Sequence, residues 1–128
     1  MDISKIYKER FALEKEYLGT NKPVNKISPI VSVCIATYQH AGFIKDCLEG
    51  ALMQKTDFDF EIIIGEDESN DGTRQICVEY AEKYPDKIRL FLRNRETSQL
   101  YDKDGKFICR FNGKWNRESA KGRYIALY

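Results

Sequence analysis

The chain has 128 residues and a formal net charge of only +1 at pH 7. Hydrophobic residues make up 42% and charged residues 32%, which is typical of one globular domain. This balance gives no electrostatic sign of a nucleic-acid or membrane partner, so we expect no nucleic acid. No apolar run approaches the roughly 20 residues that cross a bilayer, so no transmembrane segment is predicted.

The four cysteines indicate free thiols rather than a zinc site. None of Cys34, Cys47, Cys77 and Cys109 shares a CxxC spacing with another, and the chain has a single histidine. The first three fall on apolar positions of predicted strands or helices, so we expect buried thiols, which suit a reducing cytoplasm. The N-terminus lacks the apolar core of a signal peptide. We therefore expect a cytoplasmic protein, with association to the inner face of the membrane left open for a full-length form.

Residues 1–29 are predicted to form a helical arm and a linker. Apolar side chains over residues 3–18 follow an imperfect helical spacing, and Gly19 is a plausible stop. The stretch 21–29 contains two prolines and is expected to connect the arm to the next domain. We interpret the arm as packing on its own domain, and contact with another subunit or a missing part of the protein is the alternative.

Residues 30–128 are predicted to form an α/β domain with a mostly parallel sheet, flanking helices and an inserted β-hairpin. Strand, helix, strand, helix and strand follow in order, which makes two right-handed crossover units. The expected elements are strands 30–36, 60–65 and 88–92, a helix over 41–54, a helix capped by Ser69 or Asp71 and ended by Pro85, a hairpin around Asp104-Gly105, a helix over 115–121, and a fourth core strand over 124–128.

An acidic cluster follows the second predicted strand directly. The residues from Ile62 to Gly65 are apolar, and Glu66, Asp67 and Glu68 come next. In a parallel sheet, ligands bind at the carboxyl ends of the strands. Carboxylates are costly to pack together, so a cluster at this place suggests a ligand that needs them.

Two other kinds of acidic site agree less well with the sequence. Asp67 to Gly72 matches the first half of a calcium loop, but the twelfth position is Val78 and a strand precedes the acids, so we reject that interpretation. A receiver-like phosphoacceptor needs an acid pair after its first strand, which here ends in Thr37-Tyr38. It also needs a lysine after a later strand, and no convincing candidate exists.

The ends of the first two strands together suggest a nucleoside pocket. If these strands are neighbours, Thr37 and Tyr38 share one crevice with Glu66 and Asp67. An aromatic ring can stack on a planar base, and a carboxylate can accept hydrogen bonds from a base N–H or from ribose hydroxyls. No G-x-G-x-x-G follows the first strand and no P-loop motif occurs, so neither of these phosphate-binding modes is predicted.

Three segments resemble glycosyltransferase family 2. They are Val31–His40 with its continuation to Gln54, Phe60–Thr73, and Ala120–Ala126, and the resemblance covers roughly residues 30–95 and 113–128. It implies a GT-A fold and an inverting transfer of sugar from a nucleotide-sugar donor, with the UDP type favoured, to a glycan or similar acceptor, as in polysaccharide synthesis. It also implies a divalent metal, Mg or Mn, in the complete enzyme.

The resemblance further implies donor-nucleotide roles for five residues. Tyr38 would stack on or pack beside the base, which is usually uracil, while Ala36 and Thr37 would line the same edge. Asp67 would hydrogen-bond the base or the ribose. Glu66 stands where the family most often has an aspartate, with the charge displaced by one methylene.

The family's metal-binding D-x-D acids and its general base would follow residue 128, so we assign no catalytic and no metal residue in this chain. Asp102-Lys103-Asp104 spells D-x-D but lies in the predicted hairpin turn, and we interpret it as solvated. Without groups to neutralise the diphosphate, efficient sugar transfer by this chain alone is not expected.

We therefore expect residues 30–128 to be a partial, truncated GT-A domain that carries the donor-nucleoside half. Uncovered apolar surface and strand edges predict a homo-oligomer. The alternative is a non-catalytic nucleotide-binding or protein-interaction module.

Overall fold

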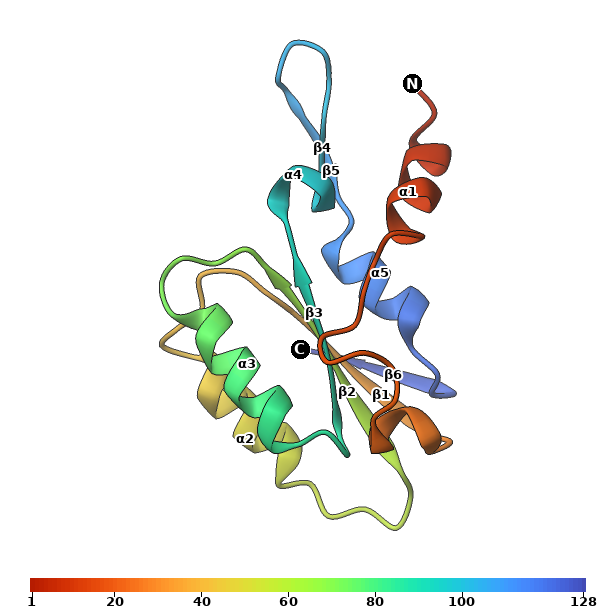
Figure 1. The fold of residues 1–128 in the computed structure, drawn as a ribbon, viewed down its shortest axis with the longest axis vertical. Helices are drawn as coiled ribbons and strands as arrows, with labels where there is room; N and C mark the ends of the chain where they lie inside the picture. The colour runs from red at the N-terminus through yellow and green to blue at the C-terminus, as the bar shows by residue number, and fades with distance from the viewer.

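The computed structural model describes all 128 residues, from Met1 to Tyr128. Its centre is a sheet of four parallel strands in the order β3-β2-β1-β6, and β4 and β5 form a separate antiparallel hairpin (Figure 1). The elements are α1 Ile3–Phe11, the 3₁₀ helix η1 Pro23–Lys26, β1 Val31–Thr37, α2 Ile44–Leu52, β2 Phe60–Asp67, α3 Thr73–Lys83, β3 Ile88–Arg93, α4 Arg95–Ser98, β4 Gln99–Tyr101, β5 Phe107–Arg110, α5 Asn112–Ser119 and β6 Tyr124–Leu127.

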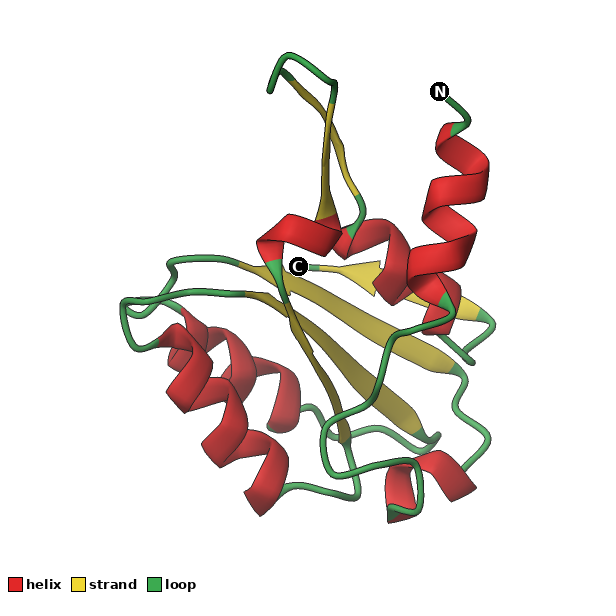
Figure 2. Cartoon of the chain, turned by 45° about the horizontal axis from the view of Figure 1, so that its top comes forward, coloured by secondary structure: helices red, strands yellow, loops and turns green.

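Helices cover both faces of the sheet, which explains the unbroken apolar sequence of its central strand. Every residue of β2 is buried. Figure 2 shows α2 and α3 on one face, where Leu48, Cys77 and Ile64 belong to the main core. On the opposite face, α5 packs on β1 and β2, and α1 packs on α5 through Tyr7 and Trp115. The predicted α/β class with a parallel sheet is confirmed.

Two of the three cysteines expected in the interior are buried. Burial raises the pKa of the Cys34 thiol to about 11 and that of Cys77 to about 12, so both thiols are protonated and inert at neutral pH. Cys47 is only half-buried, and burial raises its pKa as well. All four cysteines are free.

The first helix is shorter than predicted. It ends at Phe11 rather than near residue 18, because the chain then turns to run beside β3, where the Tyr17 N–H donates to the Leu90 carbonyl at 2.7 Å. Leu18 and Gly19 both have positive φ, at 65° and 77°, so this segment bends away from helical geometry. Tertiary contacts therefore override an apolar spacing that was only imperfectly helical.

The predicted capping of α3 by Asp71 is confirmed, although the N-cap position itself is Gly72, with φ of 103°. The Asp71 carboxylate accepts the N–H of Thr73, the first residue of α3, at 3.1 Å and the Thr73 hydroxyl at 2.6 Å. Ser69 is used elsewhere, in a contact with the loop after β1.

The predicted hairpin is present, with Gly105 at φ of 81° in its turn. The Asp102 carboxylate accepts the backbone N–H groups of Asp104 and Lys106, at 2.9 and 2.8 Å. The D-x-D sequence therefore organises a surface turn, as interpreted from the sequence.

A buried ion-pair network lies on the α5 face of the sheet. Arg89 of β3 donates to Glu61 of β2 at 2.9 Å and to Glu16 at 2.8 Å, and Glu16 also pairs with Lys22 at 3.0 Å. Glu61 in turn accepts a hydrogen bond of 2.6 Å from the Ser32 hydroxyl on β1. Buried charges are tolerated when they are paired in this way, so the network ties three strands to the N-terminal segment.

Gly65 is expected to resist substitution because polar side chains pack directly against its Cα. A Cβ built there would lie 2.5 Å from Asn112 Oδ1 and 2.7 Å from Asn116 Oδ1. Gly65→Ala should lower the free energy of unfolding in urea by about 1–3 kcal/mol through overpacking. Gly50→Ala is the control, since a Cβ there meets nothing within 4 Å and alanine favours the helix. Equal stability of the two variants would contradict this packing.

The ion-pair network predicts a specific loss of stability in acid. Burial raises the pKa of Glu16, but hydrogen bonds from Asn25, Arg89 and Lys22 outweigh it and hold that pKa below its ordinary value of 4.5. The stabilisation is therefore complete above about pH 4.5 and is lost as the pH falls through the lower folded value. Glu16→Gln should cost about 3 kcal/mol at neutral pH, because Arg89 and Lys22 lose a charged partner.

The difference in the free energy of unfolding between wild type and Glu16→Gln should shrink as the pH falls below about 4.5 and the wild-type carboxyl becomes protonated. Urea unfolding followed at several pH values measures it. A difference that stays constant over this range would show that Glu16 does not titrate with folding.

Candidate functional site

The strands β1 and β2 end side by side at one edge of the sheet. Their parallel register pairs Thr37 with Glu66, so the next residues, Tyr38 and Asp67, are also neighbours. Successive side chains of a strand point to opposite faces. Tyr38 and Asp67 therefore share the α5 face, whereas Glu66 points to the face covered by α3.

Tyr38 and Asp67 open onto one cleft with a volume of about 440 Å³, which we call the strand-end cleft. The β1 end and the loop after it form one wall, α4 contributes an arginine, and the end of β5 and the start of α5 form the other side. The lining residues are Ala36, Thr37, Tyr38, His40, Asp67, Arg95, Arg110, Asn112 and Gly113.

Four of the five residues predicted to bind a nucleotide line this cleft, and Glu66 does not. The Glu66 carboxylate is fully buried, lies 2.5 Å from Arg74 Nε and accepts the Ser69 N–H at 2.9 Å. It therefore joins β2 to α3 and to the loop between them.

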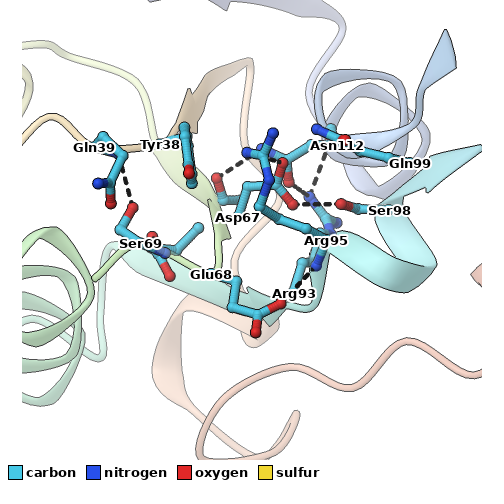
Figure 3. A network of polar contacts seen from close by, with 12 residues as sticks. Tyr38, Gln39, Asp67, Glu68, Ser69, Arg93, Arg95, Ser98, Gln99 and Asn112 are labelled. Carbon is cyan, nitrogen blue, oxygen red and sulfur yellow. Dashed lines mark hydrogen bonds and ion pairs between the residues drawn. The ribbon is translucent and has the colours of Figure 1, made fainter. Parts of the chain in front are cut away.

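The carboxylate of Asp67 is buried and held by two donors. The Ser98 hydroxyl donates to Oδ1, and Arg95 Nη1 lies 3.4 Å from Oδ2 (Figure 3). In such a weakly solvated place, a carboxylate makes stronger hydrogen bonds than it does in water. Asp67 is therefore fixed in orientation, and a ligand that supplies N–H or O–H donors can be recognised there.

Arg95 also covers the ring of Tyr38. Its Cζ atom lies 3.7 Å from the ring centroid, close enough for a cation–π contact, and the tyrosine remains 40% exposed. The backbone N–H of Arg95 donates to the Glu68 carboxylate at 2.8 Å. The Arg95 guanidinium thus contacts both Tyr38 and Asp67, the two residues that the sequence predicted to share a pocket.

Sequence reasoning missed Arg95, Ser98 and Arg110. Arg95 lies two residues after the end of β3, so the rule that placed Tyr38 and Asp67 at strand ends could have found it as well. Ser98 and Arg110 flank the hairpin, and their approach to the cleft depends on a tertiary fold that no local pattern signals.

The loop after β1 is clasped to the loop after β2. The Gln39 N–H donates to Ser69 Oγ at 2.8 Å, and the side chains of Gln39 and Asn70 join at 2.8 Å. The backbone N–H of Asn70 donates a hydrogen bond of 2.7 Å to Gln39 Oε1. Gln39 has φ of 56°, so these bonds stabilise a left-handed residue that sets the position of Tyr38.

A buried arginine supports the opposite side of the strand-end cleft. Arg93 Nη1 donates to Asn112 Oδ1 at 2.9 Å and to Asn116 Oδ1 at 2.5 Å, while its Nε pairs with Glu14 at 2.5 Å. Burial lowers the pKa of Arg93, and the Glu14 carboxylate opposes that shift. Through these bonds β3 positions the start of α5, where Asn112 and Gly113 line the cleft.

The side chains present do not fit a divalent metal. No group of three or more His, Cys, Asp or Glu residues is arranged to hold one. Asp67, the acid in the cleft, faces the Arg95 cation instead. No helix is both long and apolar enough to cross a membrane.

Comparison with known proteins identifies the family. The sequence model of glycosyl transferase family 2 matches residues 32–100, more than half of the chain. The chain therefore belongs to glycosyltransferase family 2.

The relatives found by sequence are considerably longer. Uncharacterised proteins of Mycobacterium tuberculosis and Mycobacterium bovis are 32% identical over 97 residues, which is 76% of this chain and 25% of theirs. An uncharacterised glycosyltransferase of Nostoc is 36% identical over 66 residues, or 51% of this chain and 20% of its own. The chain thus spans a quarter or less of the length of these relatives.

Among solved structures, the mannosyltransferase PcManGT of Pyrobaculum calidifontis, in complex with GDP-Man and Mn2+, is similar. It is 23% identical and has a TM-score of 0.44, and the match covers 72% of this chain and 26% of the mannosyltransferase.

The clasp between the two loops predicts a local effect of Gln39→Ala. The Asn70 N–H loses its acceptor, so its hydrogen exchange should accelerate, and the free energy of unfolding should fall by about 1 kcal/mol. Gln75→Ala is a matched control, because the exposed Gln75 side chain hydrogen-bonds to Glu79 within α3 at 3.2 Å. Unchanged exchange at Asn70 in the Gln39 variant, measured by NMR, would contradict the clasp.

Proposed function

We propose that this chain forms the donor-nucleoside site of a family 2 glycosyltransferase and binds the nucleotide of a UDP-type sugar donor in the strand-end cleft. The observation that carries the proposal is the shared opening of Tyr38 and Asp67 onto one cleft. Its place at the carboxyl ends of parallel strands is where α/β folds bind ligands.

The two residues divide the recognition of a nucleoside between them. The Tyr38 ring offers a face on which a base stacks, a contact worth about 1–3 kcal/mol per base. The Asp67 carboxylate accepts hydrogen bonds from a base N–H or from ribose hydroxyls, and its charge strengthens those bonds. Ser98 orients that carboxylate, so the acceptor is fixed before the ligand arrives.

The remaining cleft residues define the edges of the proposed site. Ala36 and Thr37 line the same cleft and precede Tyr38 in the chain. Thr37 Oγ1 lies 2.8 Å from His40 Nδ1, so the hydroxyl is held to the loop. Glu66 has no part in this proposal, because its carboxylate is bonded to Arg74 and Ser69.

The proposal for this chain is limited to donor binding. The family resemblance implies Mg or Mn at the diphosphate, yet the side chains present supply no ligand set for a metal. Sugar transfer to a glycan acceptor is proposed for the longer proteins of which such a domain forms a quarter or less. UDP is proposed from the resemblance to the family, and GDP is the comparison nucleotide.

Calorimetric titration with UDP and with GDP, with and without manganese, tests this function. The wild-type chain should bind one of the two nucleotides without needing the metal. Tyr38→Ala should weaken that binding by roughly fivefold to a hundredfold through the loss of stacking. Asp67→Asn, which preserves shape and removes charge, should weaken it about tenfold or more.

Tyr124→Ala is the matched control for the aromatic substitution, because Tyr124 is 61% exposed and lies outside the strand-end cleft. Its nucleotide affinity should equal that of the wild type. A chain that binds neither nucleotide, or binds one equally well after Tyr38→Ala, would overturn the proposal.

A further inference from the structure

The strand-end cleft already contains a planar group that makes the two contacts assigned to the base. The Arg95 guanidinium stacks on the Tyr38 ring at 3.7 Å, and its Nη1 lies 3.4 Å from Asp67 Oδ2. A base that stacks on Tyr38 and donates to Asp67 needs the same space and the same partners. Arg95 and the base are therefore mutually exclusive, an inference that rests on the function proposed above.

The arginine can leave the cleft without disturbing the fold. Its backbone is fixed independently of the side chain, because the Arg95 N–H bonds to Glu68 and the Asn94 side chain caps α4. The Arg95 side chain is 30% exposed, and its hydrogen-bonding partner is Asp67. A rotation of the side chain about its own bonds is therefore sufficient to clear the Tyr38 ring.

The charges around the cleft determine what can displace Arg95. Two guanidinium groups, Arg95 and Arg110, line the cleft against one carboxylate, Asp67. An uncharged nucleoside that displaces Arg95 takes over Asp67, so the arginine loses its ion pair with that carboxylate. A nucleoside diphosphate brings its own anion, and guanidinium groups bind phosphate oxygens in pairs.

We propose that Arg95 is a specificity-determining residue, which makes the cleft accept nucleoside diphosphates and discriminate against uncharged nucleosides. In the empty cleft the guanidinium occupies the place of the base. On binding, it moves to the diphosphate and joins Arg110 there. The cleft discriminates because only a ligand with a diphosphate offers Arg95 a new anionic contact in place of its contacts with Tyr38 and Asp67.

The test compares UDP with uridine, or GDP with guanosine if GDP is the nucleotide that binds, on wild type and on Arg95 variants. Wild type should bind the diphosphate far more tightly than the nucleoside. In Arg95→Ala, nucleoside binding should strengthen by about threefold to tenfold, because no cation–π contact or ion pair has to be broken. Diphosphate binding should weaken, so the ratio of the two affinities should fall by about tenfold or more.

Arg95→Lys separates charge from shape, since lysine retains the cation and loses the planar stacking group. The lysine variant should keep most of its affinity for the diphosphate, and its affinity for the nucleoside should rise. Arg123→Ala is the matched control, because Arg123 lies outside the cleft, with its Cζ atom 6.0 Å from the centroid of the Tyr124 ring. The ratio of diphosphate to nucleoside affinity in this variant should equal that of wild type. Circular dichroism on heating verifies that each variant is folded.

An unchanged ratio in Arg95→Ala, with diphosphate binding that still depends on Asp67, would overturn this inference and leave the proposed function intact. Absence of any nucleotide binding by wild type and variants alike would overturn the proposed function, and this inference with it.

Discussion

The parallel pairing of β1 with β2 is the constraint on which the site depends. Thr37 opposite Glu66 is the last pair of that register, and the chain continues from it into two loops. Because side chains alternate along a strand, the pairing directs Tyr38 and Asp67 to one face and separates them from Glu66. A slip of one residue would turn the aromatic ring or the carboxylate away from the cleft.

Charged side chains inside the fold hold this edge of the sheet in place. Arg89 and Arg93 of β3 both point to the α5 face, where one binds the N-terminal segment and the other binds the start of α5. Buried ion pairs add little net stability, but leaving one charge unpaired is costly. The network therefore favours a single position for α5, and with it the cleft wall at Asn112.

Much of the fold was predictable because the strands are short, apolar and bounded by turn residues. The pairing of Tyr38 with Asp67 in one cleft followed from the rule for strand ends. The alternation of side chains along a strand would have placed the Glu66 side chain on the face opposite to that of Asp67, because the two residues are adjacent in β2. Ser98, Arg110 and the shortened α1 were not anticipated, because all three depend on contacts between segments far apart in the chain.

The most direct test of the account follows backbone and arginine side-chain NMR signals of the labelled chain during titration with UDP. We expect shifts centred on residues 36–38, on Asp67 and on the Arg95 guanidinium, which loses its contact with the Tyr38 ring. Shifts centred instead on the neighbouring apolar pocket at Phe43 and Tyr128, with the signals of Tyr38 and Asp67 unchanged, would contradict it.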